Sequence, residues 1–184
     1  MAQADDASCP AESKGSSLEQ AKKNFEFFWR KDSPFSQWHK AKFSVDGQLY
    51  NCAEQFMMHQ KAVLFGDHAV AEKILTSKDP RAQKSLGRKV KNFDEAAWTG
   101  ECFNIVKRGN RAKFSQNDSL KSILFATHPR TLVEASPVDT IWGIGLSEDN
   151  PLAWDRSTWQ GKNLLGLALT EVRDELMGEE QLQV

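Results

Sequence analysis

The chain has 184 residues, of which 40% are hydrophobic and 27% are charged, as expected of one ordinary globular domain. Its formal net charge of -1 and its sequence pI of about 6.4 argue against a protein that mainly wraps duplex nucleic acid nonspecifically. They do not exclude an enzyme that handles one nucleotide at a time. No apolar run approaches the roughly 18 residues of a membrane span, so we expect no membrane partner.

The expected compartment follows from the N-terminus and from the cysteines. The N-terminus lacks a basic region followed by an apolar stretch, so we expect no secretory signal. Cys9, Cys52 and Cys102 are widely spaced and odd in number, which is typical of free thiols in a reducing compartment, here the cytoplasm or the nucleus. The histidines and cysteines show no zinc-ligand spacing, so we predict no metal site, and we expect no cofactor.

Composition divides the chain into three parts. Residues 1–20 are rich in Ala, Ser, Asp and Glu and nearly free of large apolar side chains, which predicts a disordered tail. The folded domain is expected at residues 21–178. Residues 179–184 are expected to form a short C-terminal tail.

Helical signals outnumber strand signals within the domain. The predicted strands are residues 24–29, 131–135 and 140–142, together with a hairpin at 42–50 that turns at Asp46-Gly47. The predicted helices are residues 51–65, a short helix capped by Asp67, residues 79–87, residues 94–114, a helix capped by Asp118, and residues 162–177. Residues 143–161 form a long connection, which in a compact domain is commonly a binding loop or a lid. The expected fold class is α+β: a mostly helical single domain with a small β-sheet or hairpin.

The segment from Asn51 to Ala62 places a carboxylate and an amine in an otherwise apolar helical stripe. Glu54, Met58 and Lys61 fall at positions i, i+4 and i+7, so they share one face of a helix. Glu54 and Lys61 are roughly 10 Å apart along the helix axis, too far for a simple ion pair, although both can reach one ligand over the stripe. Charged groups near a core face are paired, neutralised or used in chemistry, so we look here first for a catalytic site.

Both charged residues also have structural interpretations. Asn51 suits a helix N-cap, and Glu54 then stands at N3, so the two residues resemble a capping box. Lys61 has a long apolar stem that lets its amine reach water from an amphipathic helix.

Aromatic, acidic and basic residues elsewhere suit a nucleotide ligand. Several of the six tryptophans lie near glycines or polar residues, where a ring can stack on a base or a ribose, although core filling is the simpler explanation for any one of them. Asp139 stands before a glycine-rich turn and suits a ribose hydroxyl, but the full dinucleotide-binding pattern is absent. Two basic stretches, within residues 78–91 and 107–113, offer phosphate contacts or form solvated helix faces.

Taken together, these segments resemble the NADAR family, the NAD- and ADP-ribose-associated proteins. Residues 51–62 look like the signature helix of the family, in which a glutamate is followed seven positions later by Lys-Ala. Further similar blocks are residues 35–38, 86–88, Trp98, residues 111–114, 132–134, 139–143 and 161–166. The resemblance covers about residues 24–177, and several blocks in the right order make it specific.

The resemblance implies an N-glycosidase, which cleaves the C1'–N bond of a ribosylated amine. Carried onto this sequence, it implies Glu54, Lys61 and Asp139 as catalytic residues. The substrate-binding residues that the same blocks imply are Phe28, Ser36, Arg88, Trp98, Trp142, Gly143 and Asn163. The mechanism stays open, because a carboxylate can activate water and a desolvated lysine can form a Schiff base with the opened sugar.

Members of the family differ in substrate. Some remove ADP-ribose from guanine in nucleic acid, and others cleave ribosylamino-pyrimidine intermediates of riboflavin synthesis. We favour ADP-ribosylated guanine, because the basic residues suit a diphosphate and because the tail and the long loop do not resemble a compact metabolic enzyme. A non-catalytic ADP-ribose-binding module is the third hypothesis. The chain departs from the family pattern at Gln55, at Trp38 and in a longer loop at 146–160. The loop bears on the choice of substrate and not on the class of reaction.

Overall fold

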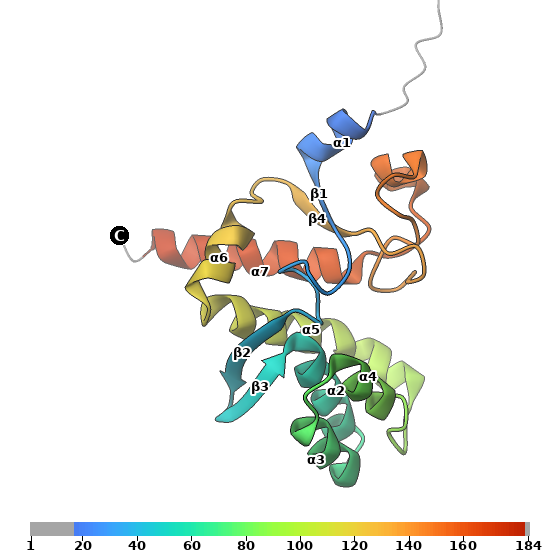
Figure 1. The fold of residues 1–184 in the computed structure, drawn as a ribbon, viewed down its shortest axis with the longest axis vertical. Helices are drawn as coiled ribbons and strands as arrows, with labels where there is room; N and C mark the ends of the chain where they lie inside the picture. Colours follow the sequence, from blue (N-terminus) through green and yellow to red (C-terminus); the bar gives the residue numbers. More distant parts are fainter. Residues whose placement is uncertain (1–16, 183–184) are drawn as a thin grey trace, which may run out of the picture.

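The structure is a computed structural model that describes residues 17–182 (Figure 1). Its helices are α1 (Leu18–Asn24), α2 (Ala53–Leu64), α3 (His68–Thr76), α4 (Pro80–Gly87), α5 (Glu95–Ser115), α6 (Asp118–Phe125) and α7 (Leu164–Gln181). Its strands are β1 (Phe25–Phe28), β2 (Lys40–Val45), β3 (Gln48–Cys52) and β4 (Thr131–Glu134), and two short 3-10 helices, η1 (Pro151–Trp154) and η2 (Arg156–Thr158), lie in the long connection. The predicted α+β class, mostly helical with little sheet, is confirmed.

The strands form two separate two-stranded sheets. Strands β2 and β3 make the predicted antiparallel hairpin, and both turn residues, Asp46 and Gly47, have positive φ angles, as a tight Asp-Gly turn requires. Strands β1 and β4 pair in parallel, with Phe28 opposite Glu134. This pairing joins two segments that are far apart in the sequence and places them beside α7 (Figure 1).

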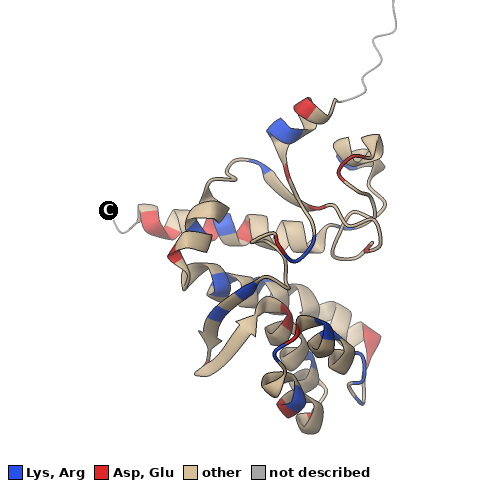
Figure 2. Ribbon diagram, in the orientation of Figure 1, with Lys and Arg blue, Asp and Glu red and all other residues tan. Residues whose placement is uncertain are grey.

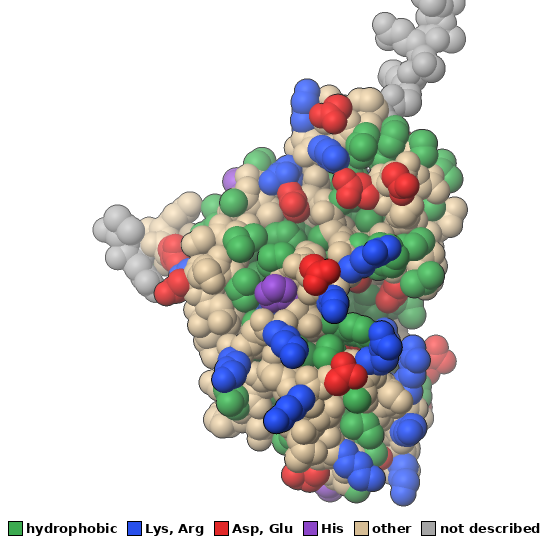
Figure 3. All heavy atoms as spheres, in the orientation of Figure 1, with side chains coloured by type: hydrophobic (Ala, Val, Ile, Leu, Met, Phe, Trp, Pro, Cys, Tyr) green, Lys and Arg blue, Asp and Glu red, His purple; other side chains and the backbone are tan. Residues whose placement is uncertain are grey.

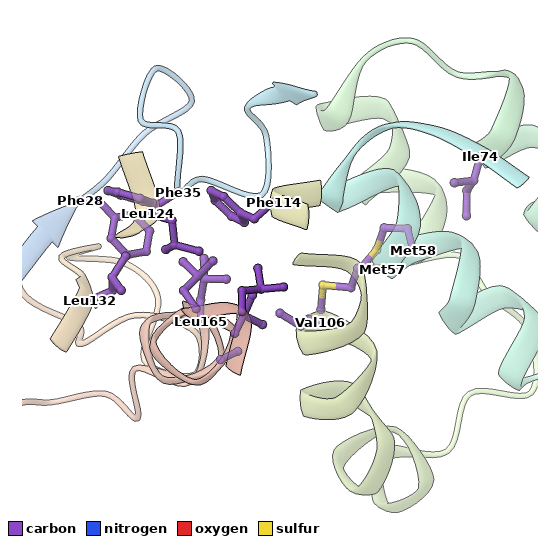
Figure 4. Close-up of a cluster of buried hydrophobic side chains, with 14 of the residues drawn as sticks. Phe28, Phe35, Met57, Met58, Ile74, Val106, Phe114, Leu124, Leu132 and Leu165 are labelled. Carbon is purple, nitrogen blue, oxygen red and sulfur yellow. The ribbon is translucent and has the colours of Figure 1, made fainter. Parts of the chain in front are cut away.

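The helices pack on one another in layers. Helix α7 lies on α5, and α5 lies on α2, which also contacts α3 and α4 (Figure 1). The main core is one cluster that runs from the β1 and β4 side through α7 and α5 to α2 (Figure 4). Its members along this line include Phe28, Leu132, Leu165, Val106 and Met57. The core therefore joins the β1–β4 sheet to α2 through α7 and α5.

Side-chain caps set several of the helix starts. Asp67 and Asp79 accept hydrogen bonds from backbone N–H groups in the first turns of α3 and α4, as predicted. The predicted cap at Asp118 is wrong, because Asn117 is the N-cap of α6. Asn117 makes no side-chain cap bond, since its amide donates to backbone carbonyl groups of β2 and α5 instead.

The two chain ends differ from expectation. Residues 18–20, which the composition assigns to a tail, begin helix α1, which Ser17 caps. The rest of the predicted N-terminal tail lies outside the described residues. Helix α7 continues to Gln181 and so enters the C-terminal tail expected at residues 179–184.

The predicted strand at residues 140–142 is also wrong. The Asp139 side chain accepts hydrogen bonds from the backbone N–H groups of Ile141 and Trp142, which closes a turn. The carbonyl groups of Ile141 and Trp142 accept from N–H groups in the first turn of α7. These carbonyl groups therefore accept hydrogen bonds from the start of α7 and not from a neighbouring strand.

Cys52 and Cys102 are buried free thiols, as predicted, and Cys9 lies outside the described residues. None of the helices α1 to α7 has the length and the apolar character needed to cross a membrane. Within residues 17–182, no group of three or more His, Cys, Asp or Glu side chains is arranged to hold a metal ion.

Candidate active site

A cavity of about 680 Å³ lies between the α2–α4 helices and the segment that follows β4. Its wall is made by the loop after β1 (residues 29–38), by α2, α4 and the first turn of α5, and by residues 134–142. The parallel pairing of β1 with β4 brings the first and the last of these segments together. The predicted residues that line the cavity are Glu54, Lys61, Asp139, Ser36, Arg88, Trp98 and Trp142.

Three predicted substrate-binding residues lie outside this lining. Phe28 is only 6% exposed and belongs to the main core, where its ring packs edge-on against Phe35. Gly143 packs against the backbone carbonyl groups of Glu134 and Asp139, where a Cβ atom would be crowded. Asn163 accepts a hydrogen bond from the N–H of Glu134 at 3.0 Å. Gly143 and Asn163 therefore support the cavity wall from behind.

A second groove, of about 910 Å³, lies on the other side of β1 and shares Trp29 and Arg30 with the cavity. It contains none of the predicted catalytic residues. Its charged groups include Glu26 and Arg130, which form an ion pair with each other. The smaller cavity is therefore the candidate active site.

Glu54 is fixed at the start of α2, and its side chain is only 5% exposed. Its backbone N–H donates to the carbonyl of Gln37 at 2.9 Å, which ties α2 to the loop after β1. Burial raises the pKa of Glu54 to about 7, while Lys84, the Trp38 indole and Arg88 oppose this rise. The carboxyl group therefore exchanges its proton near neutral pH, as a general acid or base must.

The capping function at this helix end belongs to a neighbour of Glu54. The N-cap of α2 is Cys52, so the predicted cap at Asn51 is wrong. The Oε1 atom of Gln55 accepts from the backbone N–H of Asn51 at 2.8 Å, and its Nε2 donates to the carbonyl of Ile74 at 3.0 Å. Gln55, at N3, therefore bonds to the residue before the N-cap, and Glu54, at N2, is not the N3 residue of a capping box.

Lys61 lies between aromatic rings in the cavity wall. Its Nζ atom is 4.5 Å from the centre of the Phe93 ring and 5.4 Å from the centre of the Trp98 ring, which is within cation–π range. Burial, and after it the charge of Arg88, lowers the pKa of Lys61. A larger fraction of this amine is therefore neutral at pH 7 than in an exposed lysine.

The two carboxylate oxygens of Asp139 differ, because one is held in a turn and the other faces no hydrogen-bond donor within the described residues. Its Oδ1 atom accepts from the N–H groups of Ile141 and Trp142 at 2.9 and 2.8 Å, and these bonds orient the carboxylate. Within the described part of the chain, its second oxygen accepts no hydrogen bond. Asp139 can therefore receive a hydroxyl group without giving up its place in the turn.

Four charged residues of the cavity wall were not predicted as site residues: Arg30, Lys31, Lys84 and Glu134. Glu134 ends β4 and lines the cavity, and burial, followed by the charge of Asp139, raises its pKa to about 7. Its Oε2 atom is buried and has no hydrogen-bond partner among residues 17–182. Lys84 of α4 lines the cavity and favours the ionised form of both glutamates. In the sequence, Glu134 is only an acid at the end of an apolar strand, and Lys84 is one of several basic residues, so neither pattern marks a site.

The two basic stretches differ in their surroundings. Lys107 and Arg111 of α5 form ion pairs with the α7 acids Glu171, Glu175 and Glu179, and the mixed charges along α7 are visible in Figure 2. In contrast, no basic residue of 78–91 forms an ion pair within the described residues. Figure 3 shows Lys and Arg side chains gathered on the lower half of one face.

Lys113, which belongs to the second stretch, is fully buried and supports the cavity loop. Its Nζ atom donates to the carbonyl groups of Pro34 and Ser36 at 2.7 and 3.0 Å. Burial lowers the pKa of Lys113 to about 7. Of the two basic stretches, only the first therefore reaches the cavity, through Lys84 and Arg88 of the α4 segment.

A cavity that holds two carboxyl groups whose pKa values are about 7 suits the hydrolysis of a glycosyl bond. Comparison with known proteins agrees with this class of chemistry. Residues 27–177 match the NADAR domain, and the chain belongs to the NADAR family. The resemblance noted in the sequence is thereby confirmed.

Several similar proteins carry the name N-glycosidase, from a virus and from bacteria. The chain is 44% identical over 146 residues to N-glycosidase R617 of Acanthamoeba polyphaga mimivirus, which covers 77% of this chain and 86% of the relative. It is 30% identical over 144 residues to N-glycosidase YbiA of Escherichia coli (strain K12), covering 78% and 79% of the two chains. The NMR structure of E. coli YbiA aligns with a TM-score of 0.71 at 27% identity, covering 86% of this chain and 88% of that chain. This protein is therefore an enzyme that cleaves N-glycosyl bonds.

A shorter match involves a longer protein. Over 113 residues the chain is 30% identical to Riboflavin biosynthesis protein PYRR, chloroplastic, of Zea mays. The match covers 59% of this chain and 16% of that relative.

Proposed function

We propose that the protein removes ADP-ribose from the amino group of guanine in nucleic acid by hydrolysing the ribosyl C1'–N bond. The observation that supports this substrate is the group of basic side chains on and around α4, which form no ion pair within residues 17–182 and reach the cavity through Lys84 and Arg88. Such groups suit the diphosphate of ADP-ribose and the neighbouring phosphates of a polynucleotide. The free thiols fit an intracellular location, in the cytoplasm or the nucleus.

The catalytic roles follow from the charge that develops in the reaction. Breaking the ribosyl bond builds positive charge on C1' and on the ring oxygen, which the Glu54 carboxylate stabilises while it activates water. Asp139 holds a ribose hydroxyl through its free oxygen. Trp98 and Trp142 give the cavity flat apolar walls for the ribose or the base.

Lys61 offers a second route through the same site. Its neutral amine attacks C1' of the substrate, the C1'–N bond breaks, and the nitrogen takes a proton and leaves as the free amine. The sugar ring opens and leaves a Schiff base on Lys61, which water later hydrolyses to release the sugar and regenerate the amine. The lowered pKa of Lys61 supports this route. The two routes share the same products, so they are separated by trapping the intermediate rather than by product analysis.

The test of the proposed substrate uses a DNA oligonucleotide that carries one ADP-ribosylated guanine. We expect the purified protein to release free ADP-ribose and to leave the guanine intact, while Glu54→Gln releases little. Absence of release, together with turnover of a ribosylamino-pyrimidine phosphate, would contradict the proposal in favour of the riboflavin intermediate. The match to a relative named for riboflavin biosynthesis is the observation that favours this second substrate.

The third hypothesis, a non-catalytic ADP-ribose-binding module, has less support. Glu54 and Lys61 both line the cavity, although a module that only binds needs neither. Calorimetry with ADP-ribose and a hydrolysis assay on the same sample distinguish the two functions. Tight binding without turnover of either N-ribosyl substrate would favour the binding module.

A further inference from the structure

We propose that Glu134 is a second catalytic carboxyl group, which gives its proton to the departing nitrogen while Glu54 acts on the opposite side of the reaction. This role was not predicted from the sequence. The proposal rests on cleavage of an N-glycosyl bond and holds for either of the two substrates considered above.

The backbone around Glu134 is held on both sides. Its N–H donates to Oδ1 of Asn163 at 3.0 Å, and its carbonyl accepts from the N–H of Ile144 at 2.9 Å. Gly143 packs against the same carbonyl so closely that a side chain would not fit. The backbone that carries the Glu134 side chain in the cavity wall is therefore held by several independent contacts.

The carboxyl group itself has no structural partner. Its Oε2 atom is buried without a hydrogen bond among the described residues, and no ion pair involves Glu134 there. Buried polar atoms are almost always hydrogen-bonded, and the exceptions commonly serve a ligand or a reaction. The free oxygen of Glu134 is therefore available to a substrate in the cavity.

The surrounding groups differ between the two glutamates, although burial raises the pKa of both to about 7. The charged groups of the cavity wall are Glu54 and Lys61 of α2, Lys84 and Arg88 of α4, Arg30 and Lys31 after β1, and Asp139 after β4. Lys84 and Arg88 favour the ionised form of Glu54, and Asp139 opposes it. Asp139 and Glu54 oppose the ionised form of Glu134, and Lys84 favours it. Because the Oε2 atom of Glu134 also has no hydrogen-bond donor among the described residues, we assign the shared proton to Glu134.

This distribution provides both partners for hydrolysis. The C1'–N bond breaks, its electron pair stays on the nitrogen, and the nitrogen takes the proton of Glu134. Water adds its oxygen to C1' and gives a proton to the Glu54 carboxylate. The products are the free amine and a sugar with a C1' hydroxyl group. The two carboxyl groups have then exchanged protonation states, and one proton returns from Glu54 to Glu134 before the next cycle.

The test compares pH–rate profiles on whichever of the two N-ribosyl substrates the wild-type protein turns over. We expect the wild-type rate to fall on both sides of an optimum near neutral pH. Glu134→Gln should lower the rate at the optimum by about 100-fold or more and remove the alkaline fall, because Gln has no proton to lose. Glu54→Gln should remove the acidic fall instead. The matched control is Glu148→Gln, a half-buried glutamate outside the cavity, which should keep the wild-type profile.

A purely structural Glu134 would give another result. The melting temperature of Glu134→Gln would drop, and its rate would fall by the same factor at every pH with the alkaline fall intact. If Glu134→Gln does not fold, carbon-13 NMR titration of the glutamate carboxyl groups in the wild-type protein decides the question. Glu134 must hold its proton to a higher pH than Glu54, and the reverse order overturns the proposal. The titration needs no substrate, so it separates this assignment from the proposed function.

Discussion

The Nζ atom of Lys61 lies 5.4 Å from the centre of the Trp98 ring, so an amine of α2 and an indole of α5 share one wall of the cavity. The Phe93 ring, 4.5 Å from the same Nζ atom, completes the aromatic setting. Aromatic faces attract the cation, and burial disfavours it. Burial, followed by the charge of Arg88, lowers the pKa of Lys61, so the amine lies against the two rings and is less basic than an exposed lysine.

Trp98→Ala should therefore disturb the position of Lys61 as well as remove a wall of the cavity. We expect turnover to fall roughly tenfold, since a cation–π contact contributes about 1–2 kcal/mol when it is desolvated. Trp98→Phe keeps an aromatic face and should lie closer to the wild-type rate. Trp98 also packs against the main core, so thermal melts of both variants must accompany the rate measurements. Equal rates in Trp98→Ala and the wild type would show that the indole is only a packing residue.

Glu54→Gln should lose most activity and yet become more stable than the wild type at alkaline pH. Burial raises the pKa of Glu54 in the folded protein from 4.5 to about 7. The folded state therefore binds the proton more tightly than the unfolded state, and wild-type stability falls as the pH rises through about 7. Gln stays neutral, so the free energies of unfolding should be similar at pH 4 and differ by about 1–3 kcal/mol at pH 8.

Urea titrations at the two pH values measure this difference. Glu148→Gln serves as the control, because it makes the same chemical change outside the cavity. A Glu54→Gln variant that is less stable than the wild type at pH 8 would show that the ionised carboxylate holds the fold together. The catalytic assignment of Glu54 would then lose its physical basis.

The two basic stretches should respond differently to the same substitution. Lys84→Ala removes a free amine from the cavity wall and should weaken ADP-ribose binding about tenfold, since charge-assisted hydrogen bonds contribute about 1.5–3 kcal/mol. Lys107→Ala removes an amine that Glu171 and Glu175 already pair, at 2.8 and 2.6 Å, and should leave binding unchanged. Calorimetry with ADP-ribose at low and moderate salt compares the two variants. Equal losses in both would mean that general charge, and not the α4 site, attracts the ligand.

Local sequence patterns were sufficient for much of this architecture. Asp67 and Asp79 mark helix starts because their side chains bond to nearby N–H groups, which requires no knowledge of the rest of the chain. Glu54 and Lys61 reach one cavity because a seven-residue spacing repeats on the same helix face.

The remaining features depend on contacts between distant segments. The parallel pairing that sets Phe28 opposite Glu134 has no local signal, and neither has the burial of Phe28 in the main core. Gly143 and Asn163 belong to blocks that surround the cavity, but the sequence does not distinguish a residue that faces the ligand from one that supports the wall. Glu134 was missed for the same reason, because its burial and its acidic neighbours come from segments that meet only in the folded protein.

Lys61→Arg tests whether the amine reacts or only supplies charge. Arg keeps a positive charge and can stack on the rings of Phe93 and Trp98, so we expect ADP-ribose binding to survive. It has no amine that can form a Schiff base, so turnover should fall strongly if the covalent route operates.

Borohydride added to the wild-type protein during turnover should then trap the sugar on Lys61, detected as a mass increase of the peptide that contains it. Burial and Arg88 lower the pKa of Lys61, so the neutral fraction of its amine, and with it the yield of trapped product, should rise from pH 6 to pH 8. The matched control is Lys121, a partly exposed amine held by Glu180 at 2.6 Å, which should stay unmodified. An active Lys61→Arg variant, together with no trapped peptide at either pH, would exclude the covalent route. Hydrolysis by water at Glu54 would then account for the reaction, and Lys61 would act through its charge alone.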